Sequence, residues 1–225
     1  IADKTRVKIN KEKFLVVYGG VNLEKYIEYD NRDLRKKLGL PFDKVLVSYV
    51  GLFKTLGVKK SLDVMIEALA YLPENINMVF VGGKKEEIAE YLGQISNKEL
   101  ISRCIFIEKQ DFEMVPLYEK AADILVIPNP DKYPFDNYCI PMKIYEYLAS
   151  RKPIIYSRLA LLDEVLGDCA LSFIPDDSKS LVQAIDIVFA EYPEAERKAV
   201  SALEKVRNYS WKKRAADILN FISIP

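Results

Sequence analysis

The stretch that decides the fold is Pro141-Met142-Lys143-Ile144-Tyr145-Glu146-Tyr147-Leu148-Ala149-Ser150, which is followed by the apolar run at 153–156. It predicts a loop that turns into a short helix over 142–150, with Pro141 near the start, where a missing N–H costs nothing. Lys143 falls in the first turn, and Glu146 lies three residues later on the same face. A helix start with free N–H groups, a positive dipole end and a nearby lysine can hold phosphate. The stretch is therefore a candidate clamp for a nucleotide-sugar.

Short apolar runs and helical patterns alternate on both sides of this stretch. Most of the apolar runs are continuous, as expected for parallel strands that are covered on both faces. Strand–helix alternation with mostly short loops predicts an α/β fold, a doubly wound and mostly parallel Rossmann-like sheet with additional C-terminal helices. The predicted strands are 14–18, 45–50, 78–81, 104–107, 124–127, 153–156 and 170–173, and the predicted helices are 61–71, 86–92, 116–122, 142–150, 160–166, 179–189, 194–206 and 211–222. Residues 1–13 are expected to be a linker or boundary segment, and 14–225 one domain.

Composition excludes several classes of protein. The 225 residues are 50% hydrophobic, but no apolar run approaches ~20 residues and no signal-peptide pattern opens the chain. The 33 basic and 33 acidic residues cancel, which argues against a broad nucleic-acid surface. The chain has no histidine, which excludes a Ser–His–Asp or Cys–His centre and an imidazole metal site, and its three cysteines lack C-x-x-C spacing. We expect a cytoplasmic protein, with peripheral contact at the cytoplasmic face of a membrane as an open alternative.

Candidate ligand-binding residues follow the predicted strands, because a doubly wound sheet binds ligands at the carboxyl ends of its strands. The chain has neither a G-x-G-x-x-G fingerprint nor a P-loop. Gly51 follows the strand at 45–50, and Lys54 and Lys60 supply positive charge before the next helix. A solvated basic loop is the alternative interpretation of this segment.

Two further strand ends supply weaker candidates. Gly82 and Gly83 end the strand at 78–81, where an ordinary turn is the alternative. The loop from Asp136 to Cys139 follows the strand at 124–127, so it is expected to face the same crevice. Aromatic side chains in this loop either pack on a sugar or cover the core.

Taken in order, these segments resemble the C-terminal, donor-binding half of a GT-B glycosyltransferase of the retaining group called group 1, or glycosyltransferase family 4. The residues at 17–26 resemble the family's "nGVDlekF", and those at 141–155 resemble "sPlKlfEYmAaGkPvv". Further similarities lie at 47–51 with 60–63 ("yvGrl…KGvd"), 77–83 ("LvivG"), 104–108 ("viFlG"), 121–128 ("aaDvlvlPs") and 209–211 ("fsW"). The similarity covers nearly the whole chain, and the order of the motifs makes it specific.

The resemblance implies roles for individual residues. Lys60 corresponds to the family's phosphate-binding lysine, and Glu146 to the second glutamate of its E-x7-E motif, which holds the ribose. Lys143 is expected to reach the diphosphate, so that Lys60, Lys143 and Glu146 form the catalytic set. The other donor-binding residues that it implies are Gly51, Lys54, Gly82, Gly83, Glu108, Asp136, Tyr138, Cys139, Ile140, Pro141 and Met142.

Three positions depart from the family's pattern. Leu52 stands where the family has a second phosphate-binding basic residue, and Tyr138 stands where the first glutamate of E-x7-E contacts the donor sugar. Pro141 replaces the usual glycine. Lys54 and Asp136 are the expected substitutes for the missing arginine and glutamate. Because of these departures, the resemblance does not identify the donor sugar.

The resemblance predicts an enzyme that transfers a sugar from a UDP- or GDP-sugar to a saccharide or lipid-linked acceptor, with retention and without a metal ion or other cofactor. Its acceptor-binding N-terminal domain is expected to be absent from this chain, so that the fragment alone does not transfer sugar. Two alternatives remain. One is a non-catalytic GT-B scaffold that has lost donor transfer, and the other is a GT-B nucleotide-sugar 2-epimerase, which the absence of histidine opposes.

Overall fold

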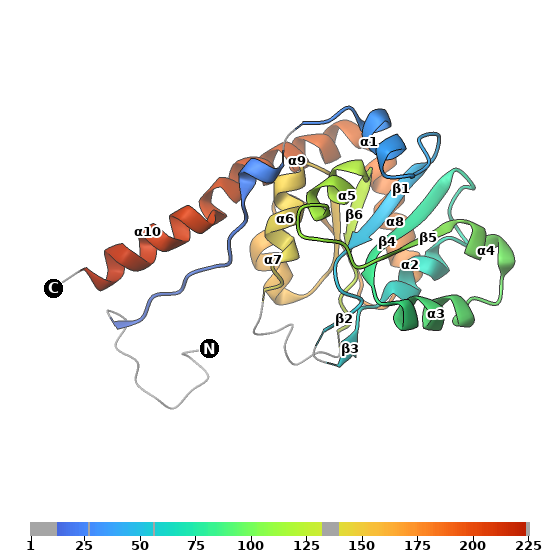
Figure 1. Ribbon diagram of the computed structural model, residues 1–225, viewed down its shortest axis with the longest axis horizontal. Coiled ribbons are helices and arrows are strands. Elements are labelled where there is room, and N and C mark those ends of the chain that lie inside the picture. The colour runs from blue at the N-terminus through green and yellow to red at the C-terminus, as the bar shows by residue number, and fades with distance from the viewer. Residues whose placement is uncertain (1–12, 27, 56, 132–139, 224–225) are drawn as a thin grey trace.

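A computed structural model of the protein describes residues 13–26, 28–55, 57–131 and 140–223. Within these residues, six parallel strands form one sheet in the order β5-β4-β1-β6-β7-β8 (Figure 1). A separate antiparallel hairpin follows the carboxyl end of β1. The strands are β1 (Val45–Val50), β2 (Lys54–Thr55), β3 (Val58–Lys59), β4 (Ile76–Gly83), β5 (Cys104–Glu108), β6 (Ile124–Ile127), β7 (Ile154–Ser157) and β8 (Leu171–Phe173).

The sheet separates two hydrophobic cores, because successive side chains of a strand point to opposite faces. In β1, Leu46 and Val50 enter one core, whereas Val47 and Tyr49 enter the other. Helices cover both faces, and the continuous apolar strands follow from this double burial. The first face carries α1 (Asn31–Lys37), α5 (Val115–Ala121), α6 (Lys143–Ser150) and α7 (Ala160–Leu166), and the second carries α2 (Leu62–Ala68), α3 (Lys85–Gln94) and α8 (Ser178–Ala190). The predicted doubly wound α/β fold is confirmed.

The predicted strand at 14–18 is wrong. Residues 14–20 have no sheet partner among the described residues, and Phe14 and Val16 are 50% and 64% exposed. The C-terminal part of the chain holds this segment instead, because Arg214 donates to the carbonyl of Tyr18 and the N–H of Val21 donates to the carbonyl of Tyr209 at 2.9 Å. An apolar run by itself does not distinguish a strand from an extended segment outside a sheet. The difference depends on whether another strand lies beside it, and the run does not encode that.

Several elements were not predicted from the sequence, among them α1, α4 (Lys98–Ser102) and the β2–β3 hairpin. Local polar side chains define the two helices. The carboxylate of Asp30 accepts from the N–H groups of Arg32 and Asp33 at the start of α1, and Asn97 caps α4 in the same way. Such short helices carry too few apolar positions for a periodic pattern.

The terminal helices are α9 (Tyr192–Val206) and α10 (Trp211–Ile222), and α10 extends away from the sheet (Figure 1). Ser210 caps α10, since its hydroxyl accepts from the N–H of Lys213 at 3.1 Å. In the described part of the chain, no helix is both long enough and apolar enough to cross a membrane. Contact with a membrane surface therefore stays a prediction. Of the predicted linker at 1–13, residues 1–12 lie outside the described residues.

Candidate functional site

A crevice is expected between β1 and β6, because the order of the strands reverses there. From β1 the chain continues to β4 and β5 on one side, and then returns to β6, β7 and β8 on the other. Ligands of doubly wound sheets bind outside the carboxyl ends of the strands at such a switch point. Gly51 follows β1 at this point, and the buried Asn129 follows β6 two residues after its end.

The two central strands separate before they end, and a tyrosine from α6 fills the space. Pairing of β1 with β6 stops at Ser48 and Leu125, so the backbone of Val50 has no partner in β6. The hydroxyl of Tyr147 accepts from the N–H of Val50 at 2.8 Å and donates to its carbonyl at 3.2 Å. This pair of bonds fixes α6 against the end of β1, and thereby sets where Lys143 lies, one helical turn earlier.

Three glycines at the carboxyl edge of the sheet allow neighbouring segments to pack closely around the switch point. A Cβ atom at Gly51 would lie 2.5 Å from Nζ of Lys143, and one at Gly82 would overlap the carbonyl oxygen of Gly51. Gly51 and Gly82 have φ angles of 147° and 120°, which side chains disfavour. A Cβ at Gly83 would overlap the ring of Phe53. The structure thus brings Gly51, Gly82 and Lys143 together, as the order of the strands predicted.

Lys143 is held over the end of β1 by a buried tyrosine. Its Nζ donates to the hydroxyl of Tyr49 and lies 3.8 Å from the centroid of the ring, within the range of a cation–π interaction. The Tyr49 hydroxyl in turn donates to the carbonyl of Leu52 at 2.6 Å. Tyr49 is 0% exposed, and burial raises its pKa, so it stays neutral and serves as a fixed acceptor for the ammonium group. A positive charge therefore lies beside Gly51 at the switch point.

Lys60 reaches the same edge of the sheet through the β2–β3 hairpin. Its N–H donates to the carbonyl of Phe53 at 2.8 Å, and its carbonyl accepts from the hydroxyl of Tyr91 at 3.0 Å. The next residue, Ser61, donates its N–H to the carbonyl of Pro128, which follows β6, at 3.0 Å. These bonds place Lys60, which is 8% exposed, between the ends of β1 and β6.

Two other predicted residues lie farther along the edge. Lys54 is exposed on β2 and lines a hollow of about 330 Å³ that also includes Lys59, Lys84 and acidic residues of α3. It therefore faces α3. Glu108 ends β5 opposite Gly83, with its carboxylate 4.0 Å from Nζ of Lys85.

The start of α6 differs from the sequence-based expectation. The N–H groups of Ile144 and Tyr145 donate to the carbonyls of Pro141 and Met142, at 3.1 and 3.0 Å, so they are not available to a phosphate. Pro141 lies two residues before the helix, and not at its first position. Met142 is exposed, with its sulfur against Gly19. The charge of Lys143 therefore matters more here than free helix N–H groups do. Ile140 packs against the first core, whereas Asp136, Tyr138 and Cys139 lie outside the described residues.

Glu146 lies one turn along α6 and is partly buried. Burial raises its pKa, while the nearby charges of Lys143 and Lys25 act in the opposite direction. Its carboxylate can therefore lose its charge at a higher pH than an exposed glutamate does. Within the described residues, no cluster of three or more Cys, Asp or Glu side chains is arranged to hold a metal ion.

Sequence reasoning missed three residues that shape the site, namely Tyr49, Tyr147 and Glu119. Tyr147 lies four residues after Lys143, so the spacing alone places both on one helix face. Tyr49 places a phenolic hydroxyl in a strand that is mostly apolar, which signals a buried hydrogen bond. Glu119 gives no such signal, because its burial depends on how α5 packs against α6.

Three comparisons with known proteins bear on this site. A family profile described as "Glycosyl transferases group 1" matches residues 30–205. A D-inositol 3-phosphate glycosyltransferase of Xylanimonas cellulosilytica is 24% identical over 192 residues, which are 83% of this chain and 44% of that protein. The O-antigen chain mannosyltransferase RfbU of Salmonella typhimurium is 24% identical over 180 residues, covering 79% of this chain and 44% of that protein.

A solved structure has the same fold. The crystal structure of Anabaena Alr3699/HepE in complex with UDP and glucose superimposes with a TM-score of 0.78 at 19% identity, over 94% of this chain and 57% of that one. The chain spans about half the length of the curated relatives that it matches. The profile match covers well over half of the 225 residues, and the chain therefore belongs to the group 1 glycosyltransferase family.

Proposed function

We propose that this chain is the donor-binding half of a glycosyltransferase that transfers a sugar from a UDP- or GDP-sugar to a saccharide or lipid-linked acceptor, with retention. The observation that carries the proposal is the fixed ammonium group of Lys143 beside Gly51 at the switch point, with Glu146 one turn along the same helix. One relative is named as an O-antigen chain mannosyltransferase, and a structure of the same fold holds UDP and glucose, which supports a nucleotide-sugar donor.

The chemistry follows from the charges at the crevice. Transfer breaks the bond between the anomeric carbon and the diphosphate, and negative charge develops on the leaving oxygen. Lys143 and Lys60 stabilise that charge, which is the largest contribution that a fixed site makes to such a reaction. The acceptor oxygen bonds to the same face of the sugar, and its proton passes to the leaving phosphate. The lysines take the role of a metal ion, and the half of the enzyme that precedes this chain holds the acceptor.

A thermal-shift titration tests donor binding directly. The chain is titrated with UDP, GDP and ADP, each with EDTA and with Mg²⁺. At a nucleotide concentration of about a hundred times the dissociation constant, binding raises the free energy of unfolding by ~2.7 kcal/mol. This raises Tm by about 5–10 °C in a domain of this size. We expect this shift with UDP or GDP in EDTA, and none with ADP. A shift that requires Mg²⁺ contradicts the metal-independent site, and no shift with UDP or GDP contradicts donor binding.

The pH dependence of nucleotide affinity identifies the ribose contact. Glu146 must be ionised to accept from two ribose hydroxyls, and burial raises its pKa. We therefore expect the affinity for the bound nucleotide to fall as pH decreases through this raised pKa, by up to about tenfold per pH unit. In Glu146→Gln the affinity for the nucleotide is lower at neutral pH, and it no longer falls with pH through the ionisation of residue 146.

Calorimetric titrations from pH 5 to 8 measure the effect. The diphosphate itself titrates, so the quantity compared is the ratio of the wild-type and variant affinities at each pH. Glu99→Gln, which removes a carboxylate from α4, is the matched control and leaves the profile unchanged. A ratio that does not vary with pH would remove Glu146 from the ribose site.

A further inference from the structure

Glu119 is a carboxyl group buried beneath the candidate site, and the proposed chemistry does not use it. The residue lies on α5 and is 0% exposed. The hydroxyl of Tyr26 donates to its Oε2 at 2.7 Å, whereas its Oε1 has no hydrogen-bond partner within the described residues. No lysine or arginine in the described ranges forms an ion pair with it. An ionised carboxylate in such surroundings is strongly unfavourable.

The groups that face Glu119 come from α6 and from the segment around Tyr26. From α6 they are Glu146, Lys143 and Tyr147. Glu146 repels an ionised Glu119, and the charge of Lys143 offsets this only in part, so that burial and repulsion raise the pKa of Glu119 well above its usual range. Two neighbouring carboxyl groups in a buried setting share one negative charge. Glu146 is the more exposed of the two and has Lys143 and Lys25 nearby, so the charge belongs there.

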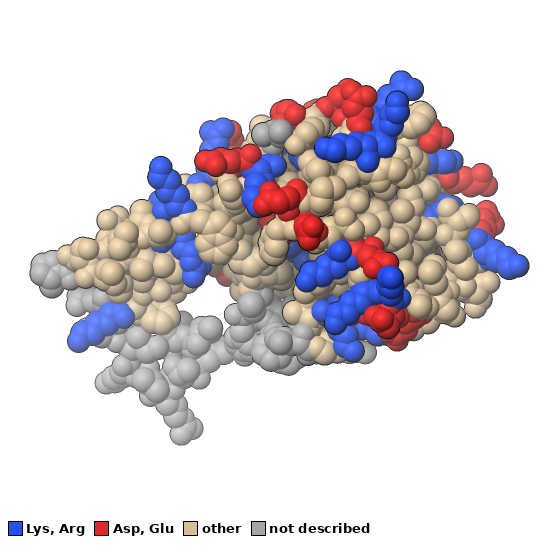
Figure 2. Space-filling model, viewed as in Figure 1, with Lys and Arg blue, Asp and Glu red and all other residues tan. Residues whose placement is uncertain are grey.

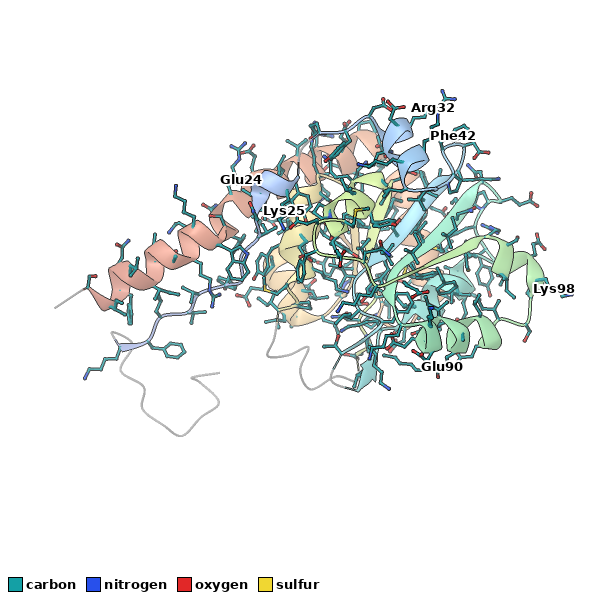
Figure 3. The ribbon with its side chains drawn as sticks, in the orientation of Figure 1. Glu24, Lys25, Arg32, Phe42, Glu90 and Lys98 are labelled. Atoms are coloured by element: carbon teal, nitrogen blue, oxygen red, sulfur yellow. The ribbon has the colours of Figure 1, made fainter. Side chains whose placement is uncertain are left out.

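The segment that carries Tyr26 is fastened across α5. It begins with the short helix η3 (Leu23–Lys25), seen beside the start of α10 in Figure 1, and Figure 3 labels Lys25 on it. Lys25 bonds to Glu113 at 2.8 Å, before α5, and Glu28 bonds to Lys120 at 3.1 Å, near its end. Tyr26 lies between these two ion pairs, so its hydroxyl is held in place against Glu119.

We propose that Glu119 is a neutral carboxylic acid that serves as the positioning residue of Glu146. Held by Tyr26, it lies within range of the charge of Glu146 without adding a second negative charge, so that Glu146 faces the crevice in its ionised form. The proposal rests on the proposed role of Glu146 as the carboxylate that holds the ribose. It predicts that the shape of Glu119 matters for nucleotide binding and that its capacity to ionise does not.

Calorimetric titration of the chain with UDP and GDP, from pH 5 to 8, tests this prediction with three variants. Glu119→Gln keeps the shape and cannot ionise, and we expect its affinity to stay within about twofold of wild type with an unchanged acid midpoint. Glu119→Ala removes the support, and we expect affinity to fall about tenfold or more. Tyr26→Phe removes only the hydroxyl that holds Glu119, and we expect it to weaken nucleotide binding as well. It provides the test if Glu119→Ala does not fold. The control Glu99→Gln removes a carboxylate from α4, outside this segment, and leaves affinity unchanged.

Two results would overturn the proposal. Tighter binding by Glu119→Gln, with an acid midpoint moved to lower pH, would show that Glu119 is ionised in the native protein. Wild-type affinity in folded Glu119→Ala, or in Tyr26→Phe where the alanine variant does not fold, would show that Glu119 does not position Glu146.

A second measurement separates this proposal from the proposed function. If wild type binds neither UDP nor GDP at any pH, the proposed function fails, and with it the positioning role. The neutrality of Glu119 is still decided by unfolding midpoints. A carboxyl group that is protonated when folded and ionised when unfolded makes stability fall as pH rises above the unfolded pKa. Wild type should therefore lose stability relative to Glu119→Gln from pH 5 to 8, and equal pH dependence would overturn the neutral acid.

Discussion

Replacing Lys143 with methionine is expected to lower the affinity for UDP or GDP by roughly 10- to 150-fold at neutral pH. This range corresponds to the ~1.5–3 kcal/mol of a hydrogen bond to a charged group. The Nζ atom is already held by Tyr49 beside Gly51, so little side-chain entropy is lost when a diphosphate binds. Methionine keeps an unbranched side chain that is one atom shorter, and it removes the charge and the donors.

Calorimetry with the nucleotide that binds wild type measures this loss, and thermal unfolding without nucleotide serves as the stability control. The unfolding midpoint should change little, because the Tyr49 hydroxyl still donates to the carbonyl of Leu52. Lys98→Met is the matched charge control, since it removes the same charge from α4, which lies outside the candidate site. Figure 3 labels Lys98 there, far from Lys25. A methionine variant that binds as wild type does would exclude Lys143 from the phosphate site.

Replacing Gly82 with alanine is expected to destabilise the protein by about 2–5 kcal/mol, the largest stability effect that we predict. Its φ angle of 120° is costly for any residue with a Cβ atom. The added Cβ would also overlap the carbonyl oxygen of Gly51. That oxygen belongs to the backbone at the end of β1, which is fixed against β4 because the N–H of Gly51 donates to the carbonyl of Val81 at 2.8 Å. The neighbour therefore cannot move aside as a flexible side chain would.

Chemical denaturation of Gly82→Ala and of a matched glycine variant checks this prediction. Gly93 lies inside α3, and within the described residues an added Cβ there would meet no atom within 4 Å. Gly93→Ala should stabilise by up to about 1 kcal/mol, because alanine is the better helix former. Equal stabilities of the two variants would mean that the edges of β1 and β4 do not approach each other as closely as the structure shows.

Surface charge agrees with the composition of the chain. In Figure 2 acidic and basic side chains are interspersed over the visible face of the sheet domain. This arrangement is typical of a solvated surface with balanced charges, and the 33 basic and 33 acidic residues of the sequence predict it. The positive charge that matters for the proposed function is instead local, at Lys143 and Lys60.

The elements that depend on continuous apolar runs could be predicted closely. The bounds of β1, β6, α7 and α10 agree with the sequence-based prediction at both ends. For the strands, a run of apolar residues between polar turns suffices, because both faces of a parallel sheet are buried. For α10, the hydroxyl of Ser210 marks the first residue of the helix. The segment at 14–18 is apolar too, but it is held by the C-terminal part of the chain, for example by Arg214 of α10. No local sequence pattern predicts this contact.

The sequence by itself determined the fold class, the strand ends at which the candidate site lies, and the presence of Lys143 and Glu146 on one turn of a helix. These follow from short-range periodicity and from the rule that parallel strands share one carboxyl edge. The tertiary structure alone decided the rest. It placed the ammonium group of Lys143 on Tyr49, and it buried Glu119 within range of the charge of Glu146. Both arrangements depend on how α6 packs against β1 and α5, and such packing joins residues that are far apart in the chain.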